Sequence, residues 1–205
     1  MRKDIIDSKE KLHEWLSYEL KRYGKWGGKL VFEIGEKAIL QKHSVLLRKT
    51  EYYLNTGKRF RATLYKIRLL KLQDKYGLHI PLNCCGKGLK IMHTGSVLIN
   101  ENAVVGDNCV FHINTALVAG KPNNTAPIIE DGCTFFVGSI VVGGIHVASH
   151  TVVGANSVVN KSIEKSNTTV AGIPAKTITE RGSLMWPENN YTSNIGKLRV
   201  NFPEN

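Results

Sequence analysis

The sequence predicts an N-terminal α-helical segment followed by a parallel β-helix, a solenoid of short strands wound in successive coils. Two observations lead to this fold class: apolar residues recur at helical spacing before residue 77, and from Ile99 onward they recur every six residues. A chain of 205 residues, 42% of them hydrophobic, can bury a core of ordinary size. We therefore expect a helical N-terminal domain (1–76), a β-helix domain (77–180) and a C-terminal tail (181–205).

Three helices are expected in the first segment. Asp7 followed three residues later by Glu10 has the pattern of a capping box and predicts a helix start. Glycines end helices because they readily adopt the left-handed conformation, and Gly24, Gly57 and Gly77 follow the three periodic stretches. The expected helices span residues 8–23, 30–55 and 58–76.

Positive charge is concentrated in the same part of the chain. Residues 1–90 hold 21 Lys and Arg against 9 Asp and Glu, a net +12, whereas residues 91–205 hold 7 against 8, a net −1. On the third predicted helix these charges form a cationic face. Such a face is explained by a solvated helix surface, and also by contact with anionic lipid head groups or an acidic polymer. No helix-turn-helix, zinc-finger or RNA-binding signature accompanies the charge, so no nucleic-acid partner is expected. The cations of the third helix and its start are Lys58, Arg59, Arg61, Lys66, Arg68, Lys71 and Lys75.

A six-residue repeat dominates the second half. One large apolar residue recurs every six positions, and the residue two positions before it is mostly small. A parallel β-helix needs this pattern, because each short strand points a side chain into a narrow core and then turns a corner. Cys109 and Cys133 fall on the small positions, so we expect buried, inert thiols. The large positions are Ile99, Val105, Phe111, Leu117, Ile129, Phe135, Val141, Val147, Val153 and Val159.

The repeat also decides two local questions. Residues 133–160 contain no Asp, Glu, Lys or Arg and are long enough for a membrane span, but their six-residue register and glycines are typical of short strands. The step from Leu117 to Ile129 skips one repeat, which predicts that residues 120–127 loop out.

No apolar stretch near Met1 has the form of a signal peptide, so we expect a cytoplasmic protein.

His93 occupies the position six residues before Ile99, where the repeat elsewhere has an aliphatic side chain. One interpretation is an irregular first coil with a hydrogen-bonded histidine. The other is a general base held on a stiff scaffold, which needs a neutral imidazole near pH 7.

Several segments around this histidine carry a family resemblance. Over about residues 30–180 the sequence resembles the left-handed β-helix, hexapeptide-repeat acyltransferases, and within them the serine acetyltransferase branch. This implies a left-handed β-helix, direct attack of an acceptor hydroxyl on acetyl-coenzyme A with His93 as base, and a cleft between subunits of a homotrimer. The segments that carry the resemblance are 76–81, 86–95, 99–110, 153–159 and 171–176.

The resemblance also implies roles for individual residues. His79 aligns with the Asp that orients the base in the family, if the alignment contains a one-residue gap between His79 and His93. Acceptor contacts are expected at Met92, His112 and Asn114. Acetyl-coenzyme A is the expected cosubstrate, and no metal is expected. The residues that the resemblance implies for binding acetyl-coenzyme A are Gly138, Ala155, Ala171, Gly172 and Lys176, the last of which is suited to phosphate.

The chain departs from serine acetyltransferases where those enzymes hold their amino acid. An Asp before the catalytic His is Met92 here, and the Arg-His-Pro that ends the family's loop is Thr125, Ala126 and Pro127. Each missing charge-assisted hydrogen bond is worth roughly 1.5–3 kcal/mol, which favours an uncharged hydroxyl acceptor.

Three functions follow from these comparisons of residues. The first expectation is an O-acetyltransferase acting on a sugar or other glycan in polysaccharide biosynthesis, with peripheral contact to an anionic membrane. The alternative is serine O-acetylation in cysteine biosynthesis. A non-catalytic solenoid that only assembles with partners is the third, and His93 is the main argument against it.

Overall fold

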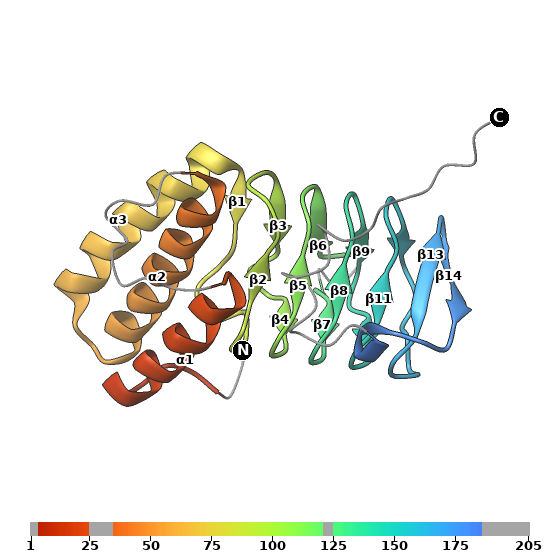
Figure 1. The fold of residues 1–205 in the computed structure, drawn as a ribbon, viewed down its shortest axis with the longest axis horizontal. Coiled ribbons are helices and arrows are strands. Elements are labelled where there is room, and N and C mark those ends of the chain that lie inside the picture. Colours follow the sequence, from red (N-terminus) through yellow and green to blue (C-terminus); the bar gives the residue numbers. More distant parts are fainter. Residues whose placement is uncertain (1–3, 25–34, 121–124, 186–205) are drawn as a thin grey trace.

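Three helices cover one end of a β-solenoid (Figure 1). The computed structural model describes residues 4–24, 35–120 and 125–185. The helices are α1 (Lys9–Arg22), α2 (Glu36–Asn55) and α3 (Arg59–Tyr76).

The helix starts and ends largely match the sequence prediction. Gly77 adopts the left-handed conformation (φ 70°) after α3, as expected of a helix-ending glycine. The predicted cap of α1 is off by one residue: Ser8, rather than Asp7, caps the helix, with its Oγ accepting from the Lys11 amide at 3.1 Å. The predicted positions 30–34 of the second helix lie outside the described residues, and α2 begins after Gly35.

The solenoid has three faces. Sheet A contains β1, β3, β6, β9 and β12; sheet B contains β4, β7 and β10; sheet C contains β2, β5, β8, β11, β13 and β14. Among the described residues, all strand pairs are parallel except β13 with β14, which form an antiparallel end to the solenoid. The strands are β1 (Leu78–His79), β2 (Lys90–Ile91), β3 (Val97–Ile99), β4 (Val104–Val105), β5 (Val110–Phe111), β6 (Thr115–Val118), β7 (Ile128–Ile129), β8 (Thr134–Phe135), β9 (Ile140–Val142), β10 (His146–Val147), β11 (Val152–Val153), β12 (Val158–Val159), β13 (Thr169–Gly172) and β14 (Ala175–Thr179), followed by a 3₁₀ turn, η1 (Ser183–Met185).

The six-residue register is confirmed. Each large apolar residue of the repeat is at most 2% exposed and belongs to one continuous core. Phe111 and Phe135, from consecutive coils, stack with ring centroids 4.8 Å apart. The uncharged window 133–160 forms β8 to β12, and no helix in the described ranges is long and apolar enough to cross a membrane.

Corner turns and buried thiols complete the solenoid. Asparagines take the left-handed conformation at several corners, among them Asn114 (φ 60°) and Asn156 (φ 52°). Cys109 and Cys133 are fully buried, as predicted. The adjacent Cys109 thiol and burial together raise the pKa of Cys133, which keeps this sulfur protonated and unreactive.

The helices share their core with the first solenoid coils. Leu47 of α2 and Leu69 of α3 belong to the same apolar cluster as Leu78 and Ile99. The change from helix to solenoid near residue 77 is therefore a change of architecture without a break in packing.

A buried arginine joins the two parts more specifically. Arg48 of α2 is fully buried and donates to Glu19 of α1 at 2.7 and 2.9 Å, to Glu51 at 2.9 Å and to the Cys85 carbonyl at 3.0 Å. Burial alone lowers the pKa of Arg48, but the Glu19 and Glu51 carboxylates outweigh it and raise that pKa. The charged guanidinium therefore fixes α1 and α2 against the first coil.

Candidate active site

The candidate site lies on one edge of the solenoid, where each coil passes from sheet C to sheet A. His93 follows β2 on this edge, His112 follows β5, and Phe136 follows β8. The rings of His93 and His112 have centroids 6.5 Å apart, and His112 stacks on Phe136 at 4.8 Å. Successive coils thus align two imidazoles and an aromatic ring along this edge, the C–A edge.

A carboxylate from the helical layer reaches the first histidine. Glu36, the first residue of α2, places Oε2 3.1 Å from His93 Nδ1. Its Oε1 accepts from the Thr94 amide at 2.7 Å and from Thr94 Oγ1 at 3.1 Å. The Thr94 amide, and also His93, lower the pKa of Glu36, so this carboxyl is ionised at neutral pH. Both side chains remain open to solvent, with 54% of His93 and 44% of Glu36 exposed.

This contact orients the imidazole. When His93 Nδ1–H donates to the carboxylate, Nε2 carries the lone pair and is able to take a proton. A carboxylate on one ring nitrogen and a free second nitrogen form the arrangement of an oriented general base.

His112 is the second imidazole of the site. It is half-buried, and burial, together with electrostatic interaction with His93 and Lys90, lowers its pKa and favours the neutral ring. Its Nε2 is buried and has no hydrogen-bond partner among the described residues. This nitrogen retains unused hydrogen-bonding capacity beside the expected base.

The other predicted acceptor contacts share this edge. Met92 is half-buried and directly precedes His93. Asn114 is exposed on the corner after β5, and its amide donates to the Ser96 carbonyl at 2.5 Å. The structure thus brings Met92, His93, His112 and Asn114 to neighbouring corners.

The residues predicted to bind coenzyme continue along the edge away from the helices. Gly138 lies on the corner after β8 and Ala155 on the corner after β11. At the end of the solenoid, Ala171 pairs with Lys176 and Gly172 with Ala175 in the β13–β14 ribbon. Ala155, Gly172 and Lys176 are exposed there.

Gly138 also has a local structural reason to be glycine. Its φ is 73°, and a Cβ atom would lie 2.1 Å from Asn156 Oδ1 on the next corner. The small residue here is therefore required by the turn itself.

His79 lies elsewhere. It ends β1 in sheet A, where it pairs with Leu98 and lines a pocket of about 480 Å³ with Lys66, Gln73 and Glu101. No hydrogen bond joins His79 to His93 in the part of the chain that the structure describes, so a single chain does not bring these two residues together as the gapped match implies. The physical reason is topological, since β1 feeds the corner from sheet A to sheet B whereas His93 follows a strand of sheet C.

Glu36 was not predicted from the sequence as a site residue. Fifty-seven residues separate it from His93, and it belongs to the helical segment rather than to the repeat. Its only local signal is an acidic residue after Gly35 at a helix start, which is common in helices that have no catalytic role. Within the described ranges, no three His, Cys, Asp or Glu side chains are grouped closely enough to hold a metal ion.

Comparison with known proteins gives consistent relatives. No protein-family model matches the sequence. The serine acetyltransferase of Buchnera aphidicola subsp. Acyrthosiphon pisum is 30% identical over 156 residues, which cover 75% of this chain and 56% of that protein. The serine acetyltransferase of Staphylococcus epidermidis is 35% identical over 99 residues, covering 47% of this chain and 46% of the relative. The chain thus spans about half the length of the curated relatives it matches.

Solved structures agree on the fold. A serine acetyltransferase of Brucella abortus superimposes with a TM-score of 0.59 at 23% identity, covering 85% of this chain and 72% of that one. The Neisseria gonorrhoeae serine acetyltransferase in complex with serine gives 0.60 at 21% identity, covering 84% and 71%. At this identity the likeness establishes the left-handed parallel β-helix preceded by helices. By sequence the chain is similar to the serine acetyltransferase-like branch of the hexapeptide-repeat acyltransferases, and it shares the fold of their solved structures.

Proposed function

We propose that this chain transfers an acetyl group from acetyl-coenzyme A to a hydroxyl group. The observation that carries the proposal is the contact between Glu36 and His93, which gives an ionised carboxylate to Nδ1 and leaves Nε2 as the base. The curated relatives, named serine acetyltransferases, support the same reaction class.

The chemistry needs a base because a neutral alcohol is a poor nucleophile. His93 Nε2 takes the hydroxyl proton as the oxygen attacks the thioester carbonyl carbon, which forms a tetrahedral intermediate. When the carbon–sulfur bond breaks, the proton on His93 passes to the departing thiolate. The products are the acetyl ester and coenzyme A, and the imidazole returns to its neutral form. Glu36 stabilises the imidazolium that exists between the two proton transfers.

The C–A edge fits an elongated thiol coenzyme. Small or absent side chains at Gly138, Ala155 and Gly172 leave the corner backbone accessible along one line from His93 to β14. Lys176 supplies an exposed ammonium at the far end, where a phosphate group would be neutralised.

Serine is the acceptor we place first. The sequence argument for a sugar rested on charged groups missing at Met92 and Ala126, and the relatives lend that glycan role no support. Glu36 changes the balance of that argument, because it provides a carboxylate beside His93 from a part of the chain outside the repeat. Its negative charge would attract an ammonium group on the acceptor across the imidazole, without a direct hydrogen bond.

A neutral hydroxyl acceptor, such as a sugar, is the second candidate. It is favoured by one specific observation: Met92 and Ala126 place uncharged side chains where the family's serine enzymes carry charged ones. The glycan remains a proposal to be tested beside serine.

Assembly into a homotrimer is part of the proposal. The outward positions of sheet A form an apolar ladder through paired residues of β3, β6, β9 and β12. An apolar strand face of this kind is suited to burial against another copy. Because the C–A edge borders sheet A, a copy seated there would flank His93. The ladder consists of Leu98, Ala116, Ile140 and Val158.

The deciding experiment measures coenzyme A release from acetyl-coenzyme A with L-serine, sugars and nucleotide-sugars offered separately. His93→Ala is compared with His13→Ala, an exposed histidine of α1. Release that depends on serine and is lost only in His93→Ala supports serine acetylation, and release that depends on a sugar supports the second candidate. No release with any acceptor, together with no binding of acetyl-coenzyme A by calorimetry, would overturn the enzymatic proposal.

A further inference from the structure

The outward face of α3 carries an exposed apolar row. Phe60, Leu64 and Ile67 follow helical i, i+4, i+7 spacing and are 78%, 42% and 47% exposed, and Leu70 beside them is 45% exposed. The opposite face of the helix is the one that packs on the core, through Ala62 and Leu69 among others. The row therefore lies outside the buried core of the described chain, and its exposure is unfavourable in water.

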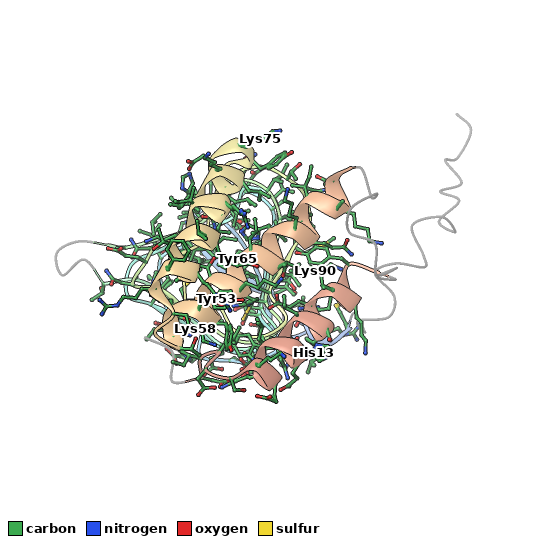
Figure 2. The ribbon with its side chains drawn as sticks, turned by 90° about the vertical axis from the view of Figure 1, so that its left-hand side faces the viewer. His13, Tyr53, Lys58, Tyr65, Lys75 and Lys90 are labelled. Carbon is green, nitrogen blue, oxygen red and sulfur yellow. The ribbon has the colours of Figure 1, made fainter. Side chains whose placement is uncertain are left out.

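Cations flank this row on both sides. Arg61, Arg68 and Lys75 recur every seven residues along one side, and Arg59 and Lys66 lie on the other. Lys71 continues the apolar row itself. Figure 2 faces the helical layer and shows Lys58 and Lys75 toward the two ends of α3, with Tyr65 between them.

Within the described residues, these charges are not neutralised by acidic side chains. None of the α3 cations forms an ion pair with a described carboxylate, and Asp74 is the only acidic residue of the helix. Arg61 and Arg68 instead lie over the rings of Tyr53 and Tyr65, at 5.8 and 5.9 Å from the centroids. The guanidinium charge is thereby held at the surface rather than compensated.

The combination of an apolar row and flanking cations favours one kind of binding partner. An apolar row bordered by Lys and Arg suits a surface that offers hydrocarbon between anionic head groups, because the row enters the boundary region while the cations remain at the phosphates. A second copy of this face would bring two sets of unpaired cations together. The solenoid half offers little compensation, since residues 91–205 carry a net charge of only −1.

We propose that α3 is a peripheral docking surface for anionic lipid bilayers. The surface is defined by the apolar row Phe60, Leu64, Ile67 and Leu70 and by the cations that flank it. The proposal does not depend on the acetyl-transfer reaction, because none of these residues belongs to the C–A edge.

The test is sedimentation of the full chain with phosphatidylcholine vesicles and with vesicles in which part of that lipid is replaced by phosphatidylglycerol. Binding is expected only to the anionic vesicles and should weaken as salt rises. The variant Lys66→Gln/Arg68→Gln/Lys71→Gln should reduce the partition coefficient about 100-fold, because each cation near an anionic surface contributes roughly fivefold. The matched control, Lys9→Gln/Lys42→Gln/Lys161→Gln, removes the same charge from exposed sites elsewhere and should bind almost as the wild type does.

A second variant separates insertion from simple charge attraction. Phe60→Ser/Ile67→Ser should also weaken binding while leaving the salt dependence in place. Equal loss in the control triple, or equal binding to neutral vesicles, would overturn the proposal. So would tighter binding to a soluble polyanion such as heparin, or conversion of the oligomer to a smaller species in Phe60→Ser/Ile67→Ser, which would make the row a contact between copies.

Discussion

Glu36 Oε2 lies 3.1 Å from His93 Nδ1, although 57 residues separate the two side chains in the sequence. The base is carried by the solenoid, whereas the group that orients it is carried by the first turn of α2. The candidate site is therefore assembled from both parts of the chain.

Replacing Glu36 with Gln tests this division of roles. The Glu36→Gln amide can still accept a hydrogen bond from Nδ1, but it carries no negative charge to stabilise the imidazolium. We expect kcat to fall about 100-fold, the lower end of what general-base catalysis contributes, with the KM for acetyl-coenzyme A unchanged. Steady-state kinetics beside Glu10→Gln, on the exposed face of α1, measure the effect. A kcat equal to that of the control would remove Glu36 from the mechanism.

Substitution of His112 tests the second imidazole. Its unpaired Nε2 and lowered pKa suit a neutral hydrogen-bonding group at the acceptor. His112→Phe keeps the stacking on Phe136 but removes the polar atoms, so the acceptor KM should rise about tenfold, the value of one or two lost hydrogen bonds. The KM for acetyl-coenzyme A should not change, and a change confined to that substrate would contradict the assignment.

Lys176 provides the test of the coenzyme end. Lys176→Gln should weaken binding of coenzyme A about threefold to tenfold, as expected for one exposed charge-assisted contact to phosphate. Titration calorimetry at low and high salt measures this, with Lys161→Gln as an equally exposed control. If the two variants bind equally, Lys176 lies outside the coenzyme path.

Arg48 anchors the helices, and its removal should reduce stability. Arg48→Met leaves the buried Glu19 and Glu51 without a counter-charge, which is expected to cost about 3–5 kcal/mol in the free energy of unfolding. Urea denaturation measures the change, with Lys42→Met on the exposed side of α2 as control. Adding Glu19→Gln and Glu51→Gln to Arg48→Met should restore part of the loss, and a further loss instead would contradict the charge argument.

Stability should also fall as the pH drops below 7. Burial, with a smaller effect of Arg48, lowers the pKa of His43 to about 4. The unfolded chain has an ordinary histidine and therefore binds more protons between pH 6.5 and 4, so the free energy of unfolding falls through that window as acid is added. Between pH 7 and pH 5 this histidine alone should remove about 2 kcal/mol. The free energy of unfolding of His43→Gln, measured by denaturation at each pH, should change less over this range than that of the wild type. An equal change in both proteins would exclude His43 as the cause.

The solenoid was the most predictable part of the molecule. A repeat of six residues specifies which side chain enters the core on every face, so Val105, Val141 and Val153 could be placed from spacing alone. Helix ends were predictable at Gly77 because the left-handed turn favours glycine. The cap of α1 was displaced by one residue because Asp7 and Ser8 are both good caps and only the backbone conformation chooses between them.

Contacts between the two halves were not predictable. Arg48 lies in an amphipathic helix, where a charged residue ordinarily indicates the solvent face, yet it is fully buried among groups of α1 and the first coil. Glu36 gave no periodic signal for the same reason, since its partner belongs to another element. His93 could be found because it interrupts a regular pattern, whereas the side chains that surround it follow only from the tertiary arrangement.

The placement of Glu36 on α2 makes the docking of the helices and the turnover of the proposed enzyme linked quantities. Any ligand that binds more tightly when Glu36 is seated on His93 must, by reciprocity, hold α2 more firmly on the solenoid. Conversely, a force that loosens the helical layer would slow proton transfer without altering a single coil. The rate of acetyl transfer would then report how firmly the helices pack against the solenoid.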